Sequence, residues 1–343
     1  MADRTDNTFP NEEEFENRLK KSRRLIMLAV ALFIALIGIG FASLNLESLQ
    51  ALGEQIRTAQ PRWLAASALS QLMTYACTAL IWRRALVSAG YSLPFRDLYW
   101  LSVGKLFADQ AIPSAGLSGG ALFFYAFAKR NIPNKIAFSL FIFVCVAYFI
   151  AFFIAGIISF AALTAVDSAS PVISTSITTV AIVLMSILVI SFLIIISLPN
   201  ATPRWAQKVP HFDQARHWVS TALYFIKTER RLFFELTALQ FFVRLIDGIT
   251  LYLAFVAINI SVPIEVCFFT VIIGSIASMV GFMPMGVGAY EAGMIATLKV
   301  FGVPIDSAIA ATVIFRGLTL WLPLIPGFYI VQREIFRKKA SAG

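Results

Sequence analysis

Charged residues, histidine and cysteine are all scarce in this chain of 343 residues. Only 14% of the residues are charged, two are histidine and three are cysteine, whereas 59% are hydrophobic and the mean hydropathy is +0.79. A soluble domain carries about 25% charged residues, so this composition excludes a soluble enzyme. Apolar runs of about 20 residues recur along the chain, and each is long enough to cross a bilayer. The sequence therefore predicts an all-α, polytopic helical membrane protein.

The few histidines and cysteines limit the chemistry of the chain. Cys77, Cys145 and Cys267 are scattered through apolar segments, a spacing that fits neither a zinc site nor a set of disulfides. His211 and His217 lie six residues apart with no third ligand nearby. We therefore predict no metal site, no cofactor and no catalytic residue. No ATP-binding loop of the Walker type is present. Any transport would therefore be driven by a gradient, by the membrane potential or by downstream consumption of the transported lipid.

The net charge of +9 comes from short basic clusters beside apolar runs. This pattern directs the basic ends of membrane helices toward the cytoplasm, and it is a better explanation than nucleic-acid binding. Residues 1–24 form a polar tail, and the apolar run Leu25–Leu44 is too long for the core of a signal peptide. We expect a single domain at 25–332 in the plasma (cell inner) membrane, between a cytoplasmic tail at 1–24 and a basic cytoplasmic tail at 333–343.

The charge pattern predicts about six full crossings, with both termini in the cytoplasm. The largest connection, residues 199–231, is rich in basic residues and is expected to be cytoplasmic. Aromatic residues alternate with polar ones there, so part of it is expected to lie as an amphipathic helix in the membrane interface. The expected crossings are residues 25–44, 63–82, 136–166, 172–198, 232–260 and 305–330.

Two further apolar stretches are interrupted by proline and glycine, and neither arm of either stretch reaches across a bilayer. Residues 98–127 break at Ile112–Gly116, and residues 264–301 break at Gly281–Gly288. Because basic residues flank both ends of the first stretch, we interpret it as a re-entrant hairpin from the cytoplasm; a kinked single span is the alternative. Broken backbone at membrane depth is tolerated only where protein or a water-filled cavity covers it, so both breaks point to a functional site.

The two hairpins occupy corresponding places in two parts of the chain. At about 62–166, span, hairpin and span run out, in and out, whereas at about 232–330 the same elements run in the opposite sense. Paired interrupted segments in two inverted halves are typical of a transporter with a binding site near the bilayer midplane. The sequence thus predicts an inverted-topology repeat.

Six ionisable residues fall at the predicted membrane depth, where a charge is costly unless it is paired or hydrated. Two pairs are spaced to share a helical face, and the third pair lies on neighbouring elements. Their charges sum to zero. Either these pairs only fix helix packing, or they line a polar groove for a lipid headgroup. The pairs are Lys105 with Asp109, Arg244 with Asp247, and Glu291 with Arg316.

Glycine-rich turns open the second arm of each hairpin. Backbone amides left free at such a helix N-terminus attract anions, so we expect the turns at Ser118–Gly120 and Gly286–Gly288 to face a phosphate. The alternative is that the glycines only permit close packing of membrane helices.

These blocks carry a family resemblance over about residues 20–335. The segment Met283–Glu291, followed by Gly302-Val-Pro, Ala308–Ala311, Arg316 and Pro326-Gly327, resembles the lysylphosphatidylglycerol synthase transmembrane-region family, also called the flippase-like domain. The block Pro113–Gly120 with Lys129-Arg130 resembles the other glycine block of that family. Met285 departs from the pattern, because a second proline or glycine is commoner there. By position, the matching residues are Gly116, Gly119, Gly120, Gly286, Gly288, Glu291 and Arg316.

The resemblance implies a polytopic helical domain with re-entrant helices that moves amphipathic lipids between leaflets or supports lipid or glycolipid assembly. In the two-part synthases a soluble aminoacyl-transfer domain follows the membrane region. Only a short tail follows it here, so lysine transfer to lipid is not expected.

The leading functional prediction is a flippase-like lipid translocase for an amphipathic lipid that is anionic or linked to a lipid carrier. One alternative is an accessory protein that supports a lipid or glycolipid synthesis partner through the loop 199–231; a homo-oligomer is compatible with either. A membrane enzyme is the third alternative. It would need general acid or base groups or metal ligands, but no histidine and no closely spaced pair of acids lies at the predicted membrane depth. The predicted substrate-binding residues are Lys105, Asp109, Gly116, Ser118, Gly119, Gly120, Arg244, Asp247, Gly286, Gly288, Glu291 and Arg316.

Overall fold

The computed structural model describes residues 53, 57–111, 117–165, 220–221, 223–280 and 288–336. The chain divides into two compact parts, residues 1–53 and 54–343, and all helices named below belong to the second. The described residues contain helices and no strand, which confirms the predicted all-helical class. The predicted crossings at 25–44 and 172–198, both breaks apart from Gly288, and most of the loop 199–231 lie outside the described residues.

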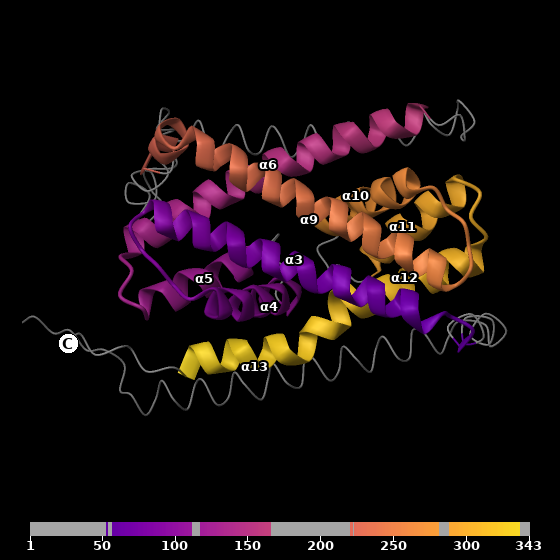
Figure 1. Ribbon diagram of the computed structural model, residues 1–343, viewed down its shortest axis with the longest axis horizontal. Helices are drawn as coiled ribbons and strands as arrows, with labels where there is room; N and C mark the ends of the chain where they lie inside the picture. The colour runs from indigo at the N-terminus through magenta and orange to yellow at the C-terminus, as the bar shows by residue number, and fades with distance from the viewer. Residues whose placement is uncertain are drawn as a thin grey trace, which may run out of the picture. The chain divides into compact units, whose positions relative to one another are not determined.

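The helices form two sets with matching lengths (Figure 1). The first set, here called the N-half, comprises α3 (Pro61–Ser88), α4 (Phe95–Ala111), α5 (Leu117–Ala128) and α6 (Asn134–Ala165), of 28, 17, 12 and 32 residues. The C-half begins with α9 (Arg230–Ala257), α10 (Ile264–Val280) and α11 (Ala289–Val300), again of 28, 17 and 12 residues. It ends with α12 (Ile305–Arg316), a π-helical turn η3 (Gly317–Trp321) and α13 (Leu322–Phe336), of 12, 5 and 15 residues in one continuous run.

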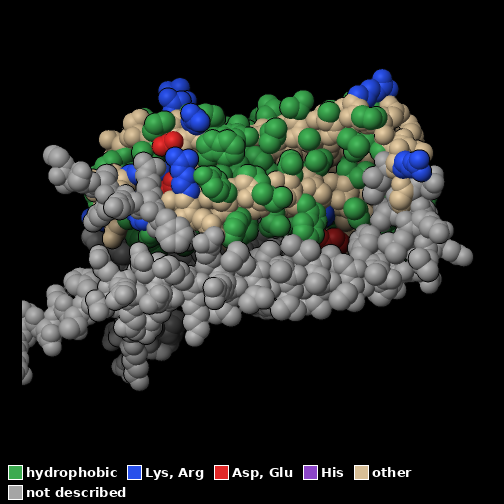
Figure 2. Space-filling view, turned by 90° about the horizontal axis from the view of Figure 1, so that it is seen from below, with side chains coloured by type: hydrophobic (Ala, Val, Ile, Leu, Met, Phe, Trp, Pro, Cys, Tyr) green, Lys and Arg blue, Asp and Glu red, His purple; other side chains and the backbone are tan. Residues whose placement is uncertain are grey.

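Four of the described helices are long and apolar enough to cross a membrane: Pro61–Ser88, Asn134–Ala162, Arg230–Ala257 and Ile305–Glu334. Large hydrophobic side chains are exposed on them, including Leu69, Met73, Phe242 and Ile325. Figure 2 shows hydrophobic side chains between two ends that carry lysine and arginine. An outward-facing apolar surface of this kind suits lipid rather than water. The chain is therefore a polytopic helical membrane protein.

The shorter helices pair within each half. A side-chain atom placed on Gly119 would meet Lys105 and Asp109, and one placed on Gly104 would meet Leu122, so α5 runs antiparallel to α4. In the same way Gly274 lies against Tyr290 and Met294, so α11 packs along α10. At 1.5 Å per residue, helices of 17 and 12 residues reach only about 25 and 18 Å, less than the ~30 Å hydrocarbon core.

The connections between helices use the same backbone chemistry in both halves. In the four connections that follow α3, α5, α9 and α11, a residue with positive φ comes just after the end of the helix, and a proline follows two or four residues later. The amide after the positive-φ residue donates to the carbonyl five residues earlier, the Schellman arrangement that ends a helix. The proline lies immediately before the first residue of the next helix, where its missing N–H is not needed. At these four connections the positive-φ residue and its proline are Gly90 with Pro94, Asn131 with Pro133, Asn259 with Pro263, and Gly302 with Pro304.

The two halves meet along α3 and α9, which lie side by side and antiparallel (Figure 1). At one end the amide of Gln60 donates to the carbonyl of Ala257 at 2.8 Å. Two turns further along α3, Ser67 Oγ donates to the carbonyl of Thr250 at 2.8 Å. At the other end Arg84 forms a 2.7 Å ion pair with Glu235. The first helices of the two halves, α3 and α9, therefore run in opposite directions.

The final helix of each half packs on the hairpin of the other half, α13 on α4 and α6 on α10. Gly327 of α13 has no side chain to separate it from Phe107 and the Val103 carbonyl. The turn η3 widens just before Pro323, because proline cannot donate the helical hydrogen bond and its ring crowds the carbonyl four residues earlier. Such π-helical turns occur often at functional sites, and this one directly follows Arg316.

A buried ion pair also fastens the two halves together. Arg130, just after α5, makes a bidentate contact with Glu334 of α13, at 2.7 and 3.0 Å. The two side chains are only 8% and 7% exposed. Lys129 adds a bond to the backbone carbonyl of Glu334 at 3.2 Å.

We predict that Glu334→Gln lowers the thermal unfolding midpoint of the detergent-solubilised protein by several degrees. Removing one partner of a buried ion pair costs up to about 3–5 kcal/mol, because the other charge stays buried. The matched control is Glu235→Gln, whose partner Arg84 has a side chain that is 54% exposed; exposed pairs contribute at most about 1 kcal/mol. Equal destabilisation by the two substitutions would contradict this prediction.

Candidate functional site

In the N-half, α4 and the start of α5 hold one cation, one carboxylate and one backbone amide in contact. Lys105 Nζ lies 2.6 Å from Asp109 Oδ2, on the i, i+4 spacing of α4. The amide of Gly119, in the first turn of α5, donates to Asp109 Oδ1 at 2.7 Å. The carboxylate of Asp109 thus bridges the lysine to the positive end of the α5 dipole.

The C-half contains the same three chemical groups at the start of α11. The amide of Gly288 donates to Glu291 Oε2 at 2.7 Å, and Arg316 Nε of α12 donates to Glu291 Oε1 at 2.6 Å. The guanidinium of Arg316 also lies over the ring of Tyr290, 4.7 Å from its centroid. The Arg316 side chain is only 7% exposed, whereas that of Glu291 is 25% exposed. Glu291 thus joins α11 to α12.

One amide of each glycine turn has a partner within the chain. The sequence suggested that several amides at each turn are left free for an anion. Of these, the Gly119 and Gly288 amides donate to carboxylates of the chain itself. Carboxylates are the natural occupants of a helix N-terminus, so an anionic ligand would have to compete with them.

The third pair lies on α9, between the other two. Arg244 Nη1 is 3.2 Å from Asp247 Oδ2, and their side chains are 18% and 11% exposed. The guanidinium of Arg244 lies 5.8 Å from the ring centroid of Tyr148 on α6. All three pairings expected from the sequence are therefore present.

Two tyrosines connect the three pairs. Tyr148 is within electrostatic reach of both Lys105 and Arg244. Tyr290 is within reach of both Arg244 and Arg316. Cations and tyrosines thus alternate from α4 to α12. We call this set the charged belt: Lys105, Asp109, Tyr148, Arg244, Asp247, Tyr290, Glu291 and Arg316.

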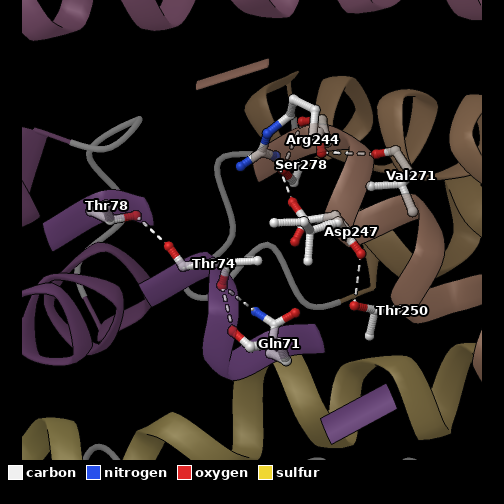
Figure 3. Close-up of polar contacts among 10 residues, drawn as sticks. Gln71, Thr74, Thr78, Arg244, Asp247, Thr250, Val271 and Ser278 are labelled. Atoms are coloured by element: carbon white, nitrogen blue, oxygen red, sulfur yellow. Dashed lines mark hydrogen bonds and ion pairs between the residues drawn. The ribbon is translucent and has the colours of Figure 1, made fainter. Parts of the chain in front are cut away.

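Figure 3 shows a polar set on α3, Gln71, Thr74 and Thr78, beside Arg244 and Asp247 of α9. Ser70 and Thr250 share a 2.7 Å hydrogen bond, which places this turn of α3 level with the Asp247 turn of α9. Tyr75, on the same part of α3, is within electrostatic reach of Asp247. Neither Gln71 nor Tyr75 is among the residues predicted from the sequence. The available signal was a glutamine and a tyrosine four residues apart inside an apolar span.

The remaining candidate residues have different surroundings. Gly116 and Gly286 lie outside the described residues, and so does the side chain of Ser118. Gly120 lies against the ring of Phe141 on α6, so its lack of a side chain serves close packing. Within the described ranges, no group of three histidine, cysteine or acidic side chains could hold a metal ion.

The family model for the lysylphosphatidylglycerol synthase TM region matches residues 26–327, most of the chain. The chain belongs to this family. A more distant relative is the UPF0104 membrane protein MJ1078 of Methanocaldococcus jannaschii, which is 27% identical over 96 residues. That match covers 27% of this chain and 41% of the relative.

In this family member, the carboxylate bridge at Gly119 leaves no room for a side chain. A Cβ atom there would lie 2.6 Å from both carboxylate oxygens of Asp109. We therefore predict that Gly119→Ala displaces Asp109 from the α5 amide and lowers the thermal unfolding midpoint in detergent.

The matched control is Gly317→Ala, at a helical glycine with φ −53° and nothing within 4 Å of a new Cβ. Alanine in a helix is favoured over glycine by about 1 kcal/mol, so this variant should be at least as stable as the wild type. A Gly119→Ala protein as stable as Gly317→Ala would contradict the role given to the Asp109 bridge.

Proposed function

We propose that the protein is a lipid translocase in which the charged belt carries the headgroup between leaflets while the acyl chains stay in the bilayer. The belt supports this because it continues across the domain from the N-half hairpin, α4–α5, to the C-half hairpin, α10–α11. A polar path inside an apolar helical domain lowers the cost of moving a charged headgroup through hydrocarbon.

The matching halves support an alternating-access mechanism. We propose that they are inverted about the bilayer midplane and that both hairpins are re-entrant. The equal helix lengths, the repeated Schellman turns and the antiparallel α3 and α9 favour this arrangement. Paired broken helices in inverted halves commonly flank the substrate site of transporters, which open to each side by rocking one half against the other.

The basic residues support an orientation. Ten of the described lysines and arginines lie at the end where α3, α5 and α13 finish, and three lie at the opposite end. By the positive-inside rule, we propose that the ten face the cytoplasm of the plasma (cell inner) membrane. The ten are Arg83, Arg84, Arg96, Lys129, Arg130, Lys135, Lys227, Arg230, Arg231 and Arg333; the three are Arg57, Arg62 and Lys299.

The substrate we propose is a lipid with an anionic headgroup. Each belt cation already has a carboxylate partner, so the empty site is close to neutral and stable without ligand. A phosphate entering beside Lys105 or Arg316 would replace Asp109 or Glu291 as the counter-ion. Exchange of one anion for another changes the local charge less than binding at an unpaired cation would.

We propose no enzymatic step, since the belt groups bind and exchange ions without a nucleophile positioned by a base. An accessory role beside a lipid or glycolipid synthesis partner is the other candidate, favoured by the family's association with lipid assembly. The two candidates differ in whether the purified protein moves lipid by itself.

The test is translocation by purified protein in liposomes with fluorescent anionic, zwitterionic or polyprenyl-phosphate lipids, followed by dithionite quenching. We expect lipid-selective quenching that falls at least about tenfold in Glu291→Gln and Arg316→Ala, the effect of losing a charge-assisted hydrogen bond. Glu235→Gln and Arg84→Ala change the same residue types outside the belt and should retain the wild-type rate. Absence of quenching with every lipid, with or without a proton gradient or potential, would contradict translocation and favour the accessory role.

A further inference from the structure

A carboxylate of the charged belt stays attached to its helix when another anion takes its place beside a cation. Glu291 and Arg316 pair at 2.6 Å, and their charges cancel. A phosphate bound at Arg316 therefore adds one negative charge to this part of the domain and leaves Glu291 without its counter-ion. An unpaired carboxylate among apolar helices is unfavourable, and protonation removes its charge. Binding of an anion at this pair thus favours uptake of a proton.

The arginine makes the proton and the anion depend on each other. Arginine stays charged in proteins, so a proton on Glu291 in the absence of a bound anion would leave a net positive charge at Arg316. The proton and the anion therefore enter and leave together. The pair of Lys105 and Asp109 does not enforce this rule, because a buried lysine can lose its own proton.

Glu291 is also the belt carboxylate with the best access to water. Its side chain is 25% exposed, against 17% for Asp109 and 11% for Asp247. Asp247 pairs with a cation three residues away on its own helix, so that pair moves as a unit. A proton that travels with the headgroup is thus best assigned to Glu291.

The contacts of Glu291 suit an exchange between two states. In the structure its Oε1 accepts from Arg316 Nε at 2.6 Å, and its Oε2 accepts from the amide of Gly288 at 2.7 Å. A protonated Glu291 can still accept from Gly288 with one oxygen while its O–H donates to a phosphate oxygen held by Arg316. The ring of Tyr290 lies 4.7 Å from the Arg316 guanidinium and supports it in both states.

Other titratable groups around Glu291 are either compensated or distant. On α9, the neutral pair Arg244 and Asp247 is within electrostatic reach of Tyr290, the neighbour of Glu291. On α12, Arg316 is the cation that contacts Glu291. The remaining titratable side chains of α10, α11 and α12 lie at or near the opposite ends of these helices: Glu265, Cys267, Lys299 and Asp306.

We infer that Glu291 takes up one proton when an anionic headgroup binds at Arg316, so that the protein carries a proton together with each lipid. This inference rests on the proposed function and names its coupling ion. The proton comes from water on the side where the lipid binds, and it returns to water on the other side when the lipid leaves. Proton and singly charged lipid together carry no net charge, so a pH difference drives their movement and the membrane potential does not.

The first test measures proton uptake when dioctanoyl phosphatidylglycerol binds to the detergent-solubilised protein. The phosphodiester of this probe keeps its single charge across the neutral pH range. We expect uptake of about one proton per bound lipid, seen with an indicator dye in weak buffer. The Kd should correspondingly rise about tenfold for each pH unit, because the coupling between two ligands is reciprocal. Dioctanoyl phosphatidylcholine, which has no net charge, should cause no uptake.

Glu291→Gln resembles the protonated state, so it should bind the probe without proton uptake and with a Kd that is independent of pH. Glu235→Gln changes a carboxylate outside the belt, paired with Arg84, and should keep the wild-type uptake. Loss of uptake in Asp109→Asn together with full uptake in Glu291→Gln would overturn the assignment. The wild-type measurement tests the inference even where a variant fails to fold.

A second test uses proteoliposomes with labelled phosphatidylglycerol and a pH difference, while potassium and valinomycin hold the potential at zero. The lipid should accumulate in the leaflet that faces the more basic side, up to about tenfold for each pH unit at equilibrium. A potential imposed at equal pH should have no effect. Liposomes without protein are the control.

The outcomes separate this inference from the translocase proposal. Absence of binding, binding without proton uptake, or equal uptake by the wild type and Glu291→Gln overturns the inference. Uptake that Glu291→Gln removes supports it even if no lipid is translocated, in which case the translocase proposal alone fails. Translocation that follows the potential and ignores the pH difference overturns the coupling and leaves the translocase proposal intact.

Discussion

Pairing of opposite charges inside an apolar domain organises how the helices of this protein pack. A charge at membrane depth is tolerated only when a counter-charge or water lies within reach. Among the described residues, three cations and three carboxylates at that depth pair one to one. The central pair lies on α9, which packs against α3, α6, α10 and α12. The elements of the domain are therefore arranged around a line of compensated charge, and apolar side chains cover the outside.

The two halves resemble each other more in the residues that shape the backbone of their connections than in the side chains of their helices. Gly90-Tyr-Ser-Leu-Pro94 and Asn259-Ile-Ser-Val-Pro263 occupy the same connection, and Asn131-Ile-Pro133 corresponds to Gly302-Val-Pro304. Only glycine and asparagine commonly adopt the left-handed conformation that ends these helices, and proline suits the start of the next one. Lipid-facing positions require only an apolar side chain, so the sequences of the halves can diverge while these connections stay alike.

Local features were the ones that sequence could predict. Lys105 with Asp109 and Arg244 with Asp247 follow from helical spacing, and the short arms of each hairpin follow from the position of proline and glycine. The predicted ends of the described helices differ from the observed ends by a few residues, as at 63–82 against Pro61–Ser88. The pairing of Glu291 with Arg316 followed from charge balance between neighbouring elements.

Contacts between distant segments were not predictable in the same way. Tyr148 and Tyr290 look like ordinary aromatic residues of apolar helices until packing places them between cations. Gln71 and Tyr75 come close to the charged pair of α9 only because antiparallel α3 and α9 are in register at Thr250. The occupation of the Gly119 amide by Asp109 depends on α5 folding back along α4, which no pattern within either helix specifies.

The carboxylate bridges also differ between the halves in a way that bears on movement. Asp109 comes from the helix before its break, so it joins α4 to α5, whereas Glu291 comes from the helix after its break and joins α11 to α12. On the proposed function, an anion that displaces Asp109 would loosen the N-half hairpin internally. An anion that displaces Glu291 would free the C-half hairpin from the final helix, next to the π-helical turn at Gly317–Trp321. The same anion would thus break a different contact between helices at each end of the belt: α4 with α5 at one end, and α11 with α12 at the other. This links the position of the headgroup to the half that moves.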